Sequence, residues 1–305
     1  MALTQRTQIY VAEAAECSSG ASPPAPNRDT ALAMGIGKVG IWMPKRFGTA
    51  AVAEIEALGY GALWLGGSPS VQEAIPFLEA TTSMTIATGI LNVWEHDPID
   101  VAAAHAGVTA RFPGRFLLGV GIGHPERTSD YTRPLATMRA FCEGLDAAPR
   151  PVSKDELVLA ALGPRMLDLA SAHASGTHTY FVTPEHTRFA RERLGADALV
   201  APEVAVVVEP DPEVARAVAR TYAASYLSLT NYVKNLLDFG FTEDDIAGNG
   251  SDRLIDAVVP HGTPGQIAAA LDEHFAAGAD HVCVQPLGHG EPPVEDYRVL
   301  ADLAR

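Results

Sequence analysis

Short runs of apolar residues alternate with longer stretches of mixed polarity from about residue 35 to the end of the chain. Several of these runs, such as FLLGV at 116–120 and VAVVV at 204–208, are apolar at every position. Strands of a parallel sheet that helices cover on both faces show this continuous pattern. The pattern predicts eight strands, at 38–43, 62–65, 84–93, 115–121, 157–162, 179–182, 204–209 and 281–286.

The stretches between these runs carry the signals that begin and end helices. A capping residue followed by proline begins three of them: Asp97 with Pro98, Thr183 with Pro184, and Thr263 with Pro264. Gly59 and Gly278 end helices just before the next strand. Eight strands that alternate with helices predict a TIM (β/α)8 barrel formed by residues 35–305, with an open, doubly wound sheet as the alternative.

Three segments do not fit the repeating pattern. Residues 1–34 are rich in Ser, Pro, Ala and Gly without periodicity, which predicts a disordered N-terminal tail. Residues 122–156 and 231–262 are longer than a simple connection needs. We expect both to be insertions at the functional rim of the barrel.

Composition and charge narrow the class of protein. Apolar residues make up 47% of the chain, and the three cysteines form no CxxC pair, which argues against a disulfide framework and for a reducing compartment. The net charge of −15 argues against a nucleic-acid or anionic-membrane partner. No membrane span or secretory signal is apparent, so we expect a cytoplasmic protein. No His, Cys and Asp residues cluster at metal spacing, and His173 and His178 are interpreted as surface or packing residues.

Glycine-rich motifs resemble known fingerprints but fail in context. GIGKVG at 35–40 matches GxGxxG, yet it precedes a strand instead of following one. GVGIGH at 119–124 follows a strand, but its third glycine comes one place early for a dinucleotide-binding turn. GGSPS at 66–70 lacks the final glycine of a nucleophile elbow. These glycines either let backbone approach a flat ligand or simply turn the chain.

In a barrel the chemistry lies where the strands end. The predicted ends are Pro44 and Lys45, 66–68, 92–97, 121–127, 163–165, 183–186 and Gln285. Two of them, GPRML and TPEH, combine a helix N-terminus with a basic residue, an arrangement that suits a phosphate. Plain helix capping explains either site equally well.

The third strand is unusual. TIATGILNVWEHDP at 85–98 has Gly89 in the middle of an apolar run and ends in several polar or aromatic residues. A glycine in a strand is typical of a bulge or of close backbone approach to a ligand.

Several collinear segments resemble one known family. They are VGIW at 39–42, TGILNVWEHDP at 88–98, RFLLGVGIGH at 115–124, ALGPRMLDLA at 161–170, YFVTPEHT at 180–187, NYVKNLLDFGFTEDDIAGNGSDRLIDAVV at 231–259 and GADHVCVQPLG at 278–288. Together they resemble the luciferase-like flavin and deazaflavin oxidoreductases, in the subgroup that uses coenzyme F420. The resemblance runs from about Lys38 to Leu287 and implies a TIM barrel, in agreement with the strand count.

The resemblance assigns cofactor-binding roles by position. Strand three of the family carries a cis peptide that supports the deazaflavin ring, which places that bond between Gly89 and Ile90. The remaining implied contacts are Ile90 and Asn92 beside the ring, Gly121 and Gly123 on its other approach, and Gly163, Pro164, Arg165, Thr183 and His186 around the phosphate. His186 stands where relatives often have lysine, so we expect a weaker and pH-sensitive anchor.

Two departures concern the proton donor. Many relatives end strand two with a triplet that contains a catalytic histidine, but this chain has LGGSPS there. A glutamate that some relatives place after strand four is replaced by His124. Our candidates for the proton relay are therefore His124 first, then His96 and Glu95.

The resemblance favours hydride transfer between coenzyme F420 and a small organic substrate. One alternative is a monooxygenase that uses reduced FMN and oxygen on the same fold. The other is a catalytically silent protein that only binds the cofactor, which the LGGSPS segment favours. Family members commonly form homodimers, and we expect the same here.

Overall fold

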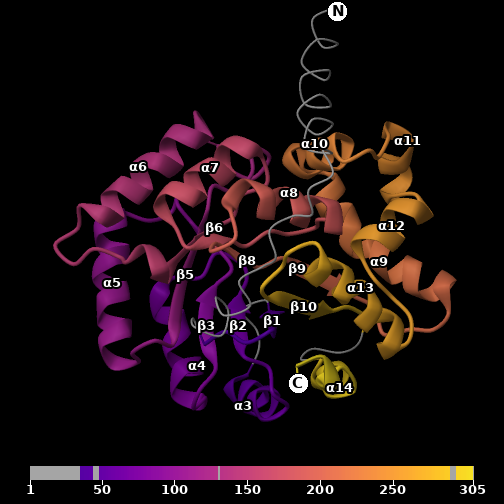
Figure 1. The fold of residues 1–305 in the computed structure, drawn as a ribbon, viewed down its shortest axis with the longest axis horizontal. Coiled ribbons are helices and arrows are strands. Elements are labelled where there is room, and N and C mark those ends of the chain that lie inside the picture. The colour runs from indigo at the N-terminus through magenta and orange to yellow at the C-terminus, as the bar shows by residue number, and fades with distance from the viewer. Residues whose placement is uncertain (1–34, 44–47, 130, 289–292, 305) are drawn as a thin grey trace, which may run out of the picture.

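The computed structural model describes residues 35–43, 48–129, 131–288 and 293–304 (Figure 1). The predicted tail at 1–34 and the predicted rim residues Pro44 and Lys45 lie outside the described residues.

Ten short strands form one parallel sheet in this part of the chain. They are β1 Val39–Met43, β2 Ala62–Leu65, β3 Thr85–Thr88, β4 Leu91–Asn92, β5 Phe116–Gly121, β6 Leu157–Leu159, β7 Gly176–Thr177, β8 Leu199–Val200, β9 Glu203–Val206 and β10 Val282–Pro286. The pairing order is β8-β7-β6-β5-β3-β2-β1-β10-β9, with β4 also beside β5. Only Ala201 and Pro202 separate β8 from β9, so the two ends of this order belong to one kinked strand and the sheet curls into the predicted barrel.

The third strand is kinked as well. Ile86 of β3 pairs with Phe116 of β5, whereas Leu91 of β4 pairs with Val120. Five steps along this strand thus match four along β5, which is the one-residue excess of a β-bulge. The bulge lies at Gly89 and Ile90, and the peptide bond between these two residues is cis, as predicted.

The inside of the barrel is filled by small, aliphatic and aromatic side chains of alternate strand residues. Trp64 and Cys283 are fully buried there, next to the small side chains of Ala62, Ala87 and Ala201. Alternate residues of the same strands point outward and pack against the helices, which explains the continuous apolar runs in the sequence.

Eight helices form the outer layer of the described part of the barrel. They are α3 Thr49–Ala57, α4 Ile75–Ala80, α5 Pro98–Arg111, α6 Pro134–Asp146, α7 Pro164–His173, α8 Pro184–Leu194, α13 Pro264–Ala276 and α14 Val294–Val299. Asp97 caps α5 as predicted, because its side chain accepts a hydrogen bond from the backbone N–H of Ile99.

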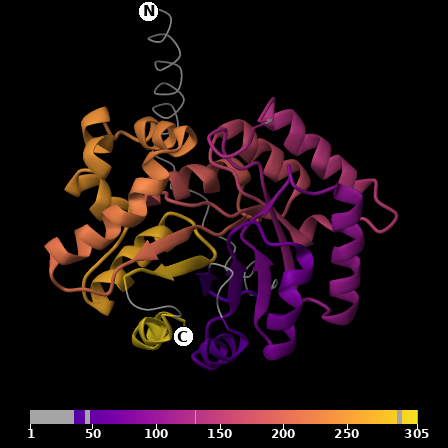
Figure 2. The ribbon, with the colours of Figure 1, turned by 180° about the vertical axis from the view of Figure 1, so that it is seen from behind.

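Four further helices lie between β9 and β10: α9 Pro212–Leu227, α10 Thr230–Asp238, α11 Glu243–Ile246 and α12 Asp252–Val258. In both views this group lies together, on the side of the barrel away from α5 (Figures 1 and 2). The segment 231–262 is therefore an insertion, as expected. The segment 122–156 is not, since α6 within it is the ordinary helix between β5 and β6.

One predicted strand is wrong. Residues 179–182 form no strand, and the chain pairs earlier, at β7. Phe181 adopts a left-handed backbone conformation, with φ of 52°, which turns the chain out of the sheet despite its β-prone side chains. The residues of β8 were missed because a two-residue strand leaves no periodic pattern.

Candidate functional site

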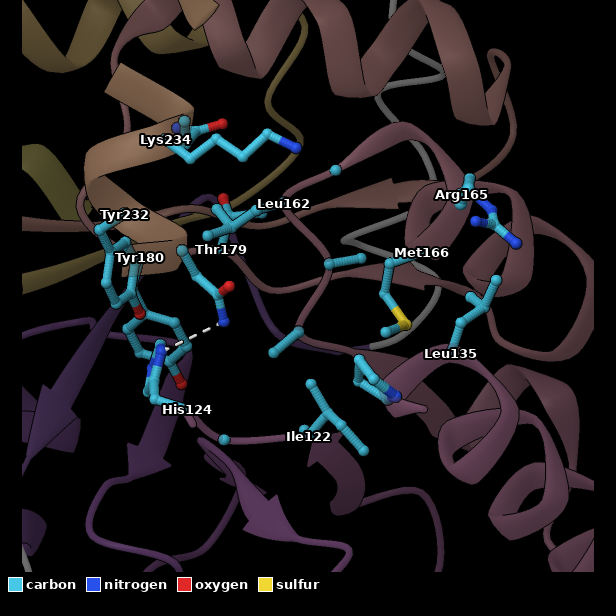
Figure 3. A pocket seen from close by; sticks show the side chains of 18 of the residues that line it. Ile122, His124, Leu135, Leu162, Arg165, Met166, Thr179, Tyr180, Tyr232 and Lys234 are labelled. Atoms are coloured by element: carbon cyan, nitrogen blue, oxygen red, sulfur yellow. Dashed lines mark hydrogen bonds between the residues drawn. The ribbon is translucent and has the colours of Figure 1, made fainter. Parts of the chain in front are cut away.

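A pocket of about 320 Å³ opens where the strands end, between the barrel and α10 (Figure 3). Its walls come from Ile90 in the bulge, from 121–124 at the end of β5, from 160–166 after β6, from 178–180 after β7, and from the first residues of α6. Helix α10 covers it with Asn231, Tyr232, Lys234, Asn235 and Asp238. The pocket therefore lies at the barrel edge where the strand-end argument predicted the chemistry.

The bulge forms one wall and is fixed from behind. Trp42 Nε1 donates a hydrogen bond of 3.0 Å to the carbonyl oxygen of Gly89. The same indole covers the end of β2, because a Cβ atom on Gly66 would come within 2.2 Å of the Trp42 ring. The Trp42 ring therefore covers the end of β2, where the segment LGGSPS has no ionisable group.

His124 lies at one end of the pocket, with Tyr180 and Tyr232, in the view of Figure 3. The His124 and Tyr232 rings are 5.0 Å apart, and His124 Nδ1 is 3.5 Å from the Asn231 amide nitrogen. Partial burial lowers the pKa of His124, and the positive charge of Arg127 lowers it further, with Glu126 opposing both. The neutral imidazole is thereby favoured, which suits a group that accepts a proton.

The opposite end of the pocket offers positive charge. Gly163 is the N-cap of α7 and Pro164 its first residue, so the positive end of this helix dipole lies at the pocket lining. The exposed side chain of Arg165 stands at the same helix end, and Lys234 reaches over the pocket from α10 (Figure 3). This combination can hold a phosphate or carboxylate group.

The floor contains two groups that the sequence analysis missed. His178, interpreted from the sequence as a surface or packing residue, and Tyr180 both line the pocket and are buried. Their rings are 4.6 Å apart, and His178 stacks on Trp64 at 4.0 Å. The sequence analysis did not assign Tyr180 to the site because it placed residues 179–182 within a strand.

Three predicted residues lie outside this lining, and two of them are joined by a hydrogen bond. Glu95 accepts hydrogen bonds from Ser68 Oγ at 2.8 Å and from the Asn92 side-chain amide at 3.0 Å. Asn92, Glu95 and His96 are all absent from the described lining of the pocket. The structure thus separates these candidates from His124, which stays the first candidate for the proton relay.

Thr183 and His186 do not reach the pocket either. Thr183 occupies the predicted N-cap position of α8, but its side chain makes no capping hydrogen bond. The ring nitrogen Nε2 of His186 lies 2.9 Å from the carbonyl oxygen of Leu162, and the ring packs against Phe239. Burial lowers the pKa of His186 to about 4. The expectation that this imidazole titrates near neutrality is therefore wrong, because the side chain is enclosed by apolar groups.

Seven predicted residues do meet in the pocket: His124, Ile90, Gly121, Gly123, Gly163, Pro164 and Arg165. Gly89 lies just behind it, with its Cα facing Tyr180 and Trp42. Tyr232 and Lys234 were not singled out, and only the prediction that 231–262 belongs to the functional rim pointed toward them.

Among the described residues, no group of three or more His, Cys, Asp or Glu side chains is placed to hold a metal ion. None of the described helices is long and apolar enough to cross a membrane.

Comparisons with known proteins agree with this architecture. The model of the luciferase-like monooxygenase family matches residues 25–143 and 131–281 of this chain. No curated protein matches its sequence.

Three solved structures share the fold of this chain. The coenzyme F420-dependent tetrahydromethanopterin reductase from Methanopyrus kandleri superposes with a TM-score of 0.71 at 15% identity, covering 87% of this chain and 97% of that one. An F420-dependent secondary alcohol dehydrogenase, in complex with an F420-acetone adduct, gives 0.65 at 14%, covering 88% and 99%. The FMN-bound oxygenating constituent of 3,6-diketocamphane monooxygenase from Pseudomonas putida gives 0.64 at 11%, covering 88% and 97%.

Proposed function

Because the chain belongs to the luciferase-like monooxygenase family, we propose that it is an oxidoreductase that transfers a hydride between coenzyme F420 and a small organic substrate in this pocket. The observation that carries the proposal is the pocket at the strand ends, walled by a bulged strand and charged at one end.

The described residues fit a flat ring with an anionic tail. Ile90 and Gly121 offer a wall, and the Ile90 side chain packs against Gly121 so closely that a Cβ atom there would come within 2.5 Å of it. Arg165, Lys234 and the start of α7 offer donors for a phosphate group. When bound, the deazaflavin supplies the hydride chemistry, while the protein supplies position and a proton.

His124 is the residue we assign to the proton. Its imidazole faces the pocket, held between Tyr232 and Asn231. A neutral imidazole accepts a proton from a hydroxyl group of an alcohol substrate, or returns it to a carbonyl oxygen in the reverse direction. The helix α10 covers this end and limits the access of water.

A reduced-FMN monooxygenase is the second candidate. Its support is the FMN-bound monooxygenase among the superposable structures. Both candidate functions would place a flat ring against Ile90 and a phosphate group near Arg165. They differ in whether the pocket prefers the ring of F420 or that of FMN.

A spectral titration of the purified protein with F420 and with FMN tests the proposal. We expect F420 to bind more tightly than FMN. Arg165→Gln should weaken binding of the phosphate-bearing cofactor by about tenfold, the worth of one charge-assisted hydrogen bond. Arg139→Gln on α6 is the matched control, because Arg139 is exposed and outside the pocket lining.

Tighter binding of FMN, with oxygen uptake when reduced FMN and substrate are supplied, would replace the proposal by the second candidate. Binding of neither ring would refute both.

A further inference from the structure

The protonation state of His178 follows from its hydrogen bonds. Its Nδ1 atom lies 2.6 Å from the backbone carbonyl oxygen of Ala201. A carbonyl oxygen only accepts hydrogen bonds, so Nδ1 must carry the hydrogen. In a neutral imidazole the other nitrogen, Nε2, then carries a lone pair and can only accept. Burial lowers the pKa of His178 to about 3, which keeps the ring neutral.

This lone pair has no donor within the protein. His178 is 0% exposed, it lines the pocket, and Nε2 finds no hydrogen-bond partner among the residues that the structure describes. A buried acceptor left in this state is unfavourable, because it has lost its hydrogen bond to water without a replacement. A group of this kind at a pocket floor indicates a ligand that brings the donor.

The hydroxyl group of Tyr180 complements it. This side chain is 8% exposed and lines the same pocket, and the described part of the chain provides no acceptor for its hydroxyl hydrogen. The nearby Trp42 Nε1 donates to the carbonyl oxygen of Gly89 and, as a donor, cannot accept the hydroxyl hydrogen. The hydroxyl oxygen lies 3.1 Å from where a Cβ atom of Gly89 would be, next to the bulge.

An acceptor and a donor therefore stand side by side, on rings 4.6 Å apart. We propose that His178 Nε2 and the Tyr180 hydroxyl group together recognise an amide-like edge, an N–H next to a carbonyl, on the ring of the bound cofactor. Flavins and deazaflavins both present such an edge at the imide of their pyrimidine ring. The inference rests on the proposed function, because it requires that a ring of this class enters the pocket.

The stacking of the His178 ring on Trp64 holds the His178 imidazole in a fixed position. The two rings are 4.0 Å apart at an angle of 23°, and the hydrogen bond to Ala201 holds the imidazole edge. A pre-positioned acceptor loses little conformational freedom when the ligand binds. His178 and Tyr180 are thus assigned as positioning residues that set the depth and orientation of the ring.

A ligand-side change tests the pair in the unaltered protein. We use FMN and its N3-methyl derivative, and the 5-deaza analogue of each, in fluorescence titrations. Methylation removes the hydrogen of the imide N–H and should weaken binding by about tenfold. Equal binding of a parent ring and its N3-methyl derivative overturns the inference but leaves the proposed function intact. Failure of F420 and of all these rings to bind overturns the proposed function and the inference with it.

Substitutions of His178 and Tyr180, combined with the methylated ligands, test which residue accepts the imide hydrogen. His178→Phe keeps an aromatic ring against Trp64 but removes the acceptor, so this variant should bind parent and methylated rings within about twofold of each other. Tyr180→Phe, which removes only the donor, should weaken both rings alike. A methylation penalty that persists unchanged in His178→Phe overturns the pairing.

The matched control is His105→Phe. His105 is also a buried imidazole whose pKa is lowered to about 4, but it lies on α5 outside the pocket lining. This variant should retain the full preference for the unmethylated ring. Thermal unfolding of each variant, followed by circular dichroism, identifies any loss of binding that reflects loss of fold. If a variant does not fold, the effect of N3-methylation on binding to the unaltered protein decides whether the inference holds.

Discussion

At the scale of single residues, Glu203 is a carboxyl group enclosed by the protein. It is 1% exposed in the barrel interior, and the hydroxyl group of Tyr222 donates to its two oxygens at 3.3 and 3.4 Å. Burial raises the pKa of this carboxyl group to about 8, against the opposing effect of the hydrogen bonds. Folding at neutral pH therefore keeps a proton on Glu203 that the unfolded chain releases.

This proton uptake makes stability depend on pH. The folded state binds more protons than the unfolded state between about pH 4.5 and 8, so the free energy of unfolding falls as pH rises through this range. Glu203→Gln retains an oxygen acceptor for Tyr222 but cannot titrate. We expect its stability in urea to fall less between pH 5 and 8 than that of the unaltered protein. Glu192→Gln, exposed on α8, is the control and should keep the original slope.

At the scale of elements, the loop after β5 and the start of α10 are joined. Glu126 Oε1 accepts a hydrogen bond of 3.0 Å from the backbone N–H of Thr230 and a second one from its hydroxyl group. Thr230 is the first residue of α10, so the carboxylate also meets the positive end of that helix. The two segments are 104 positions apart in the chain, and together they enclose His124.

Glu126→Ala should loosen this junction. Without the carboxylate, the N–H and hydroxyl groups of Thr230 lose their acceptor, and the segment 122–129 loses its link to the helix. We expect faster amide hydrogen exchange in both segments, measured by mass spectrometry, with little change elsewhere. Glu143→Ala on the exposed face of α6 serves for comparison. Unchanged exchange at 122–129 would mean that packing of His124 on Tyr232 suffices to hold the loop.

At the scale of the whole molecule, one buried ion pair joins the segments that lead into β8 and β10. Arg191 is fully buried near the end of α8 and pairs with Asp280, just before β10. Its guanidinium also donates to the carbonyl oxygens of Gly195, Ala198 and Gly278, and Asp280 accepts from the N–H of Val200. The contacts hold the chain where the barrel closes.

Removal of this cation should destabilise the whole fold. Arg191→Met leaves the Asp280 carboxylate buried without its partner, which costs about 3–5 kcal/mol of unfolding free energy. Arg193→Met on the same helix removes a pair with Asp168 that is partly exposed, and we expect a loss of about 1 kcal/mol at most. Urea unfolding of both variants measures the difference. Equal losses would show that the buried pair contributes no more than the surface pair.

Local patterns in the sequence were reliable where a structure depends on neighbouring residues. Pro98 after Asp97 marked the start of α5, and Gly89 in an apolar run marked the bulge between β3 and β4. The pattern failed at 179–182, where β-prone side chains lie outside the sheet, and at the two-residue β8. In both places pairing with distant strands, and not local preference, decides where the strand lies.

The sequence by itself determined the alternation of strands and helices, and with it the barrel and the strand ends at which a site forms. Only the tertiary structure decided which of those ends share a pocket. In the tertiary structure His124 lies beside α10, and His178 forms part of the pocket floor. Glu95 and Asn92 lie outside the pocket lining. The physical reason is that periodicity and capping act over a few residues, whereas a pocket depends on strand register and on the path of an insertion that returns over the barrel.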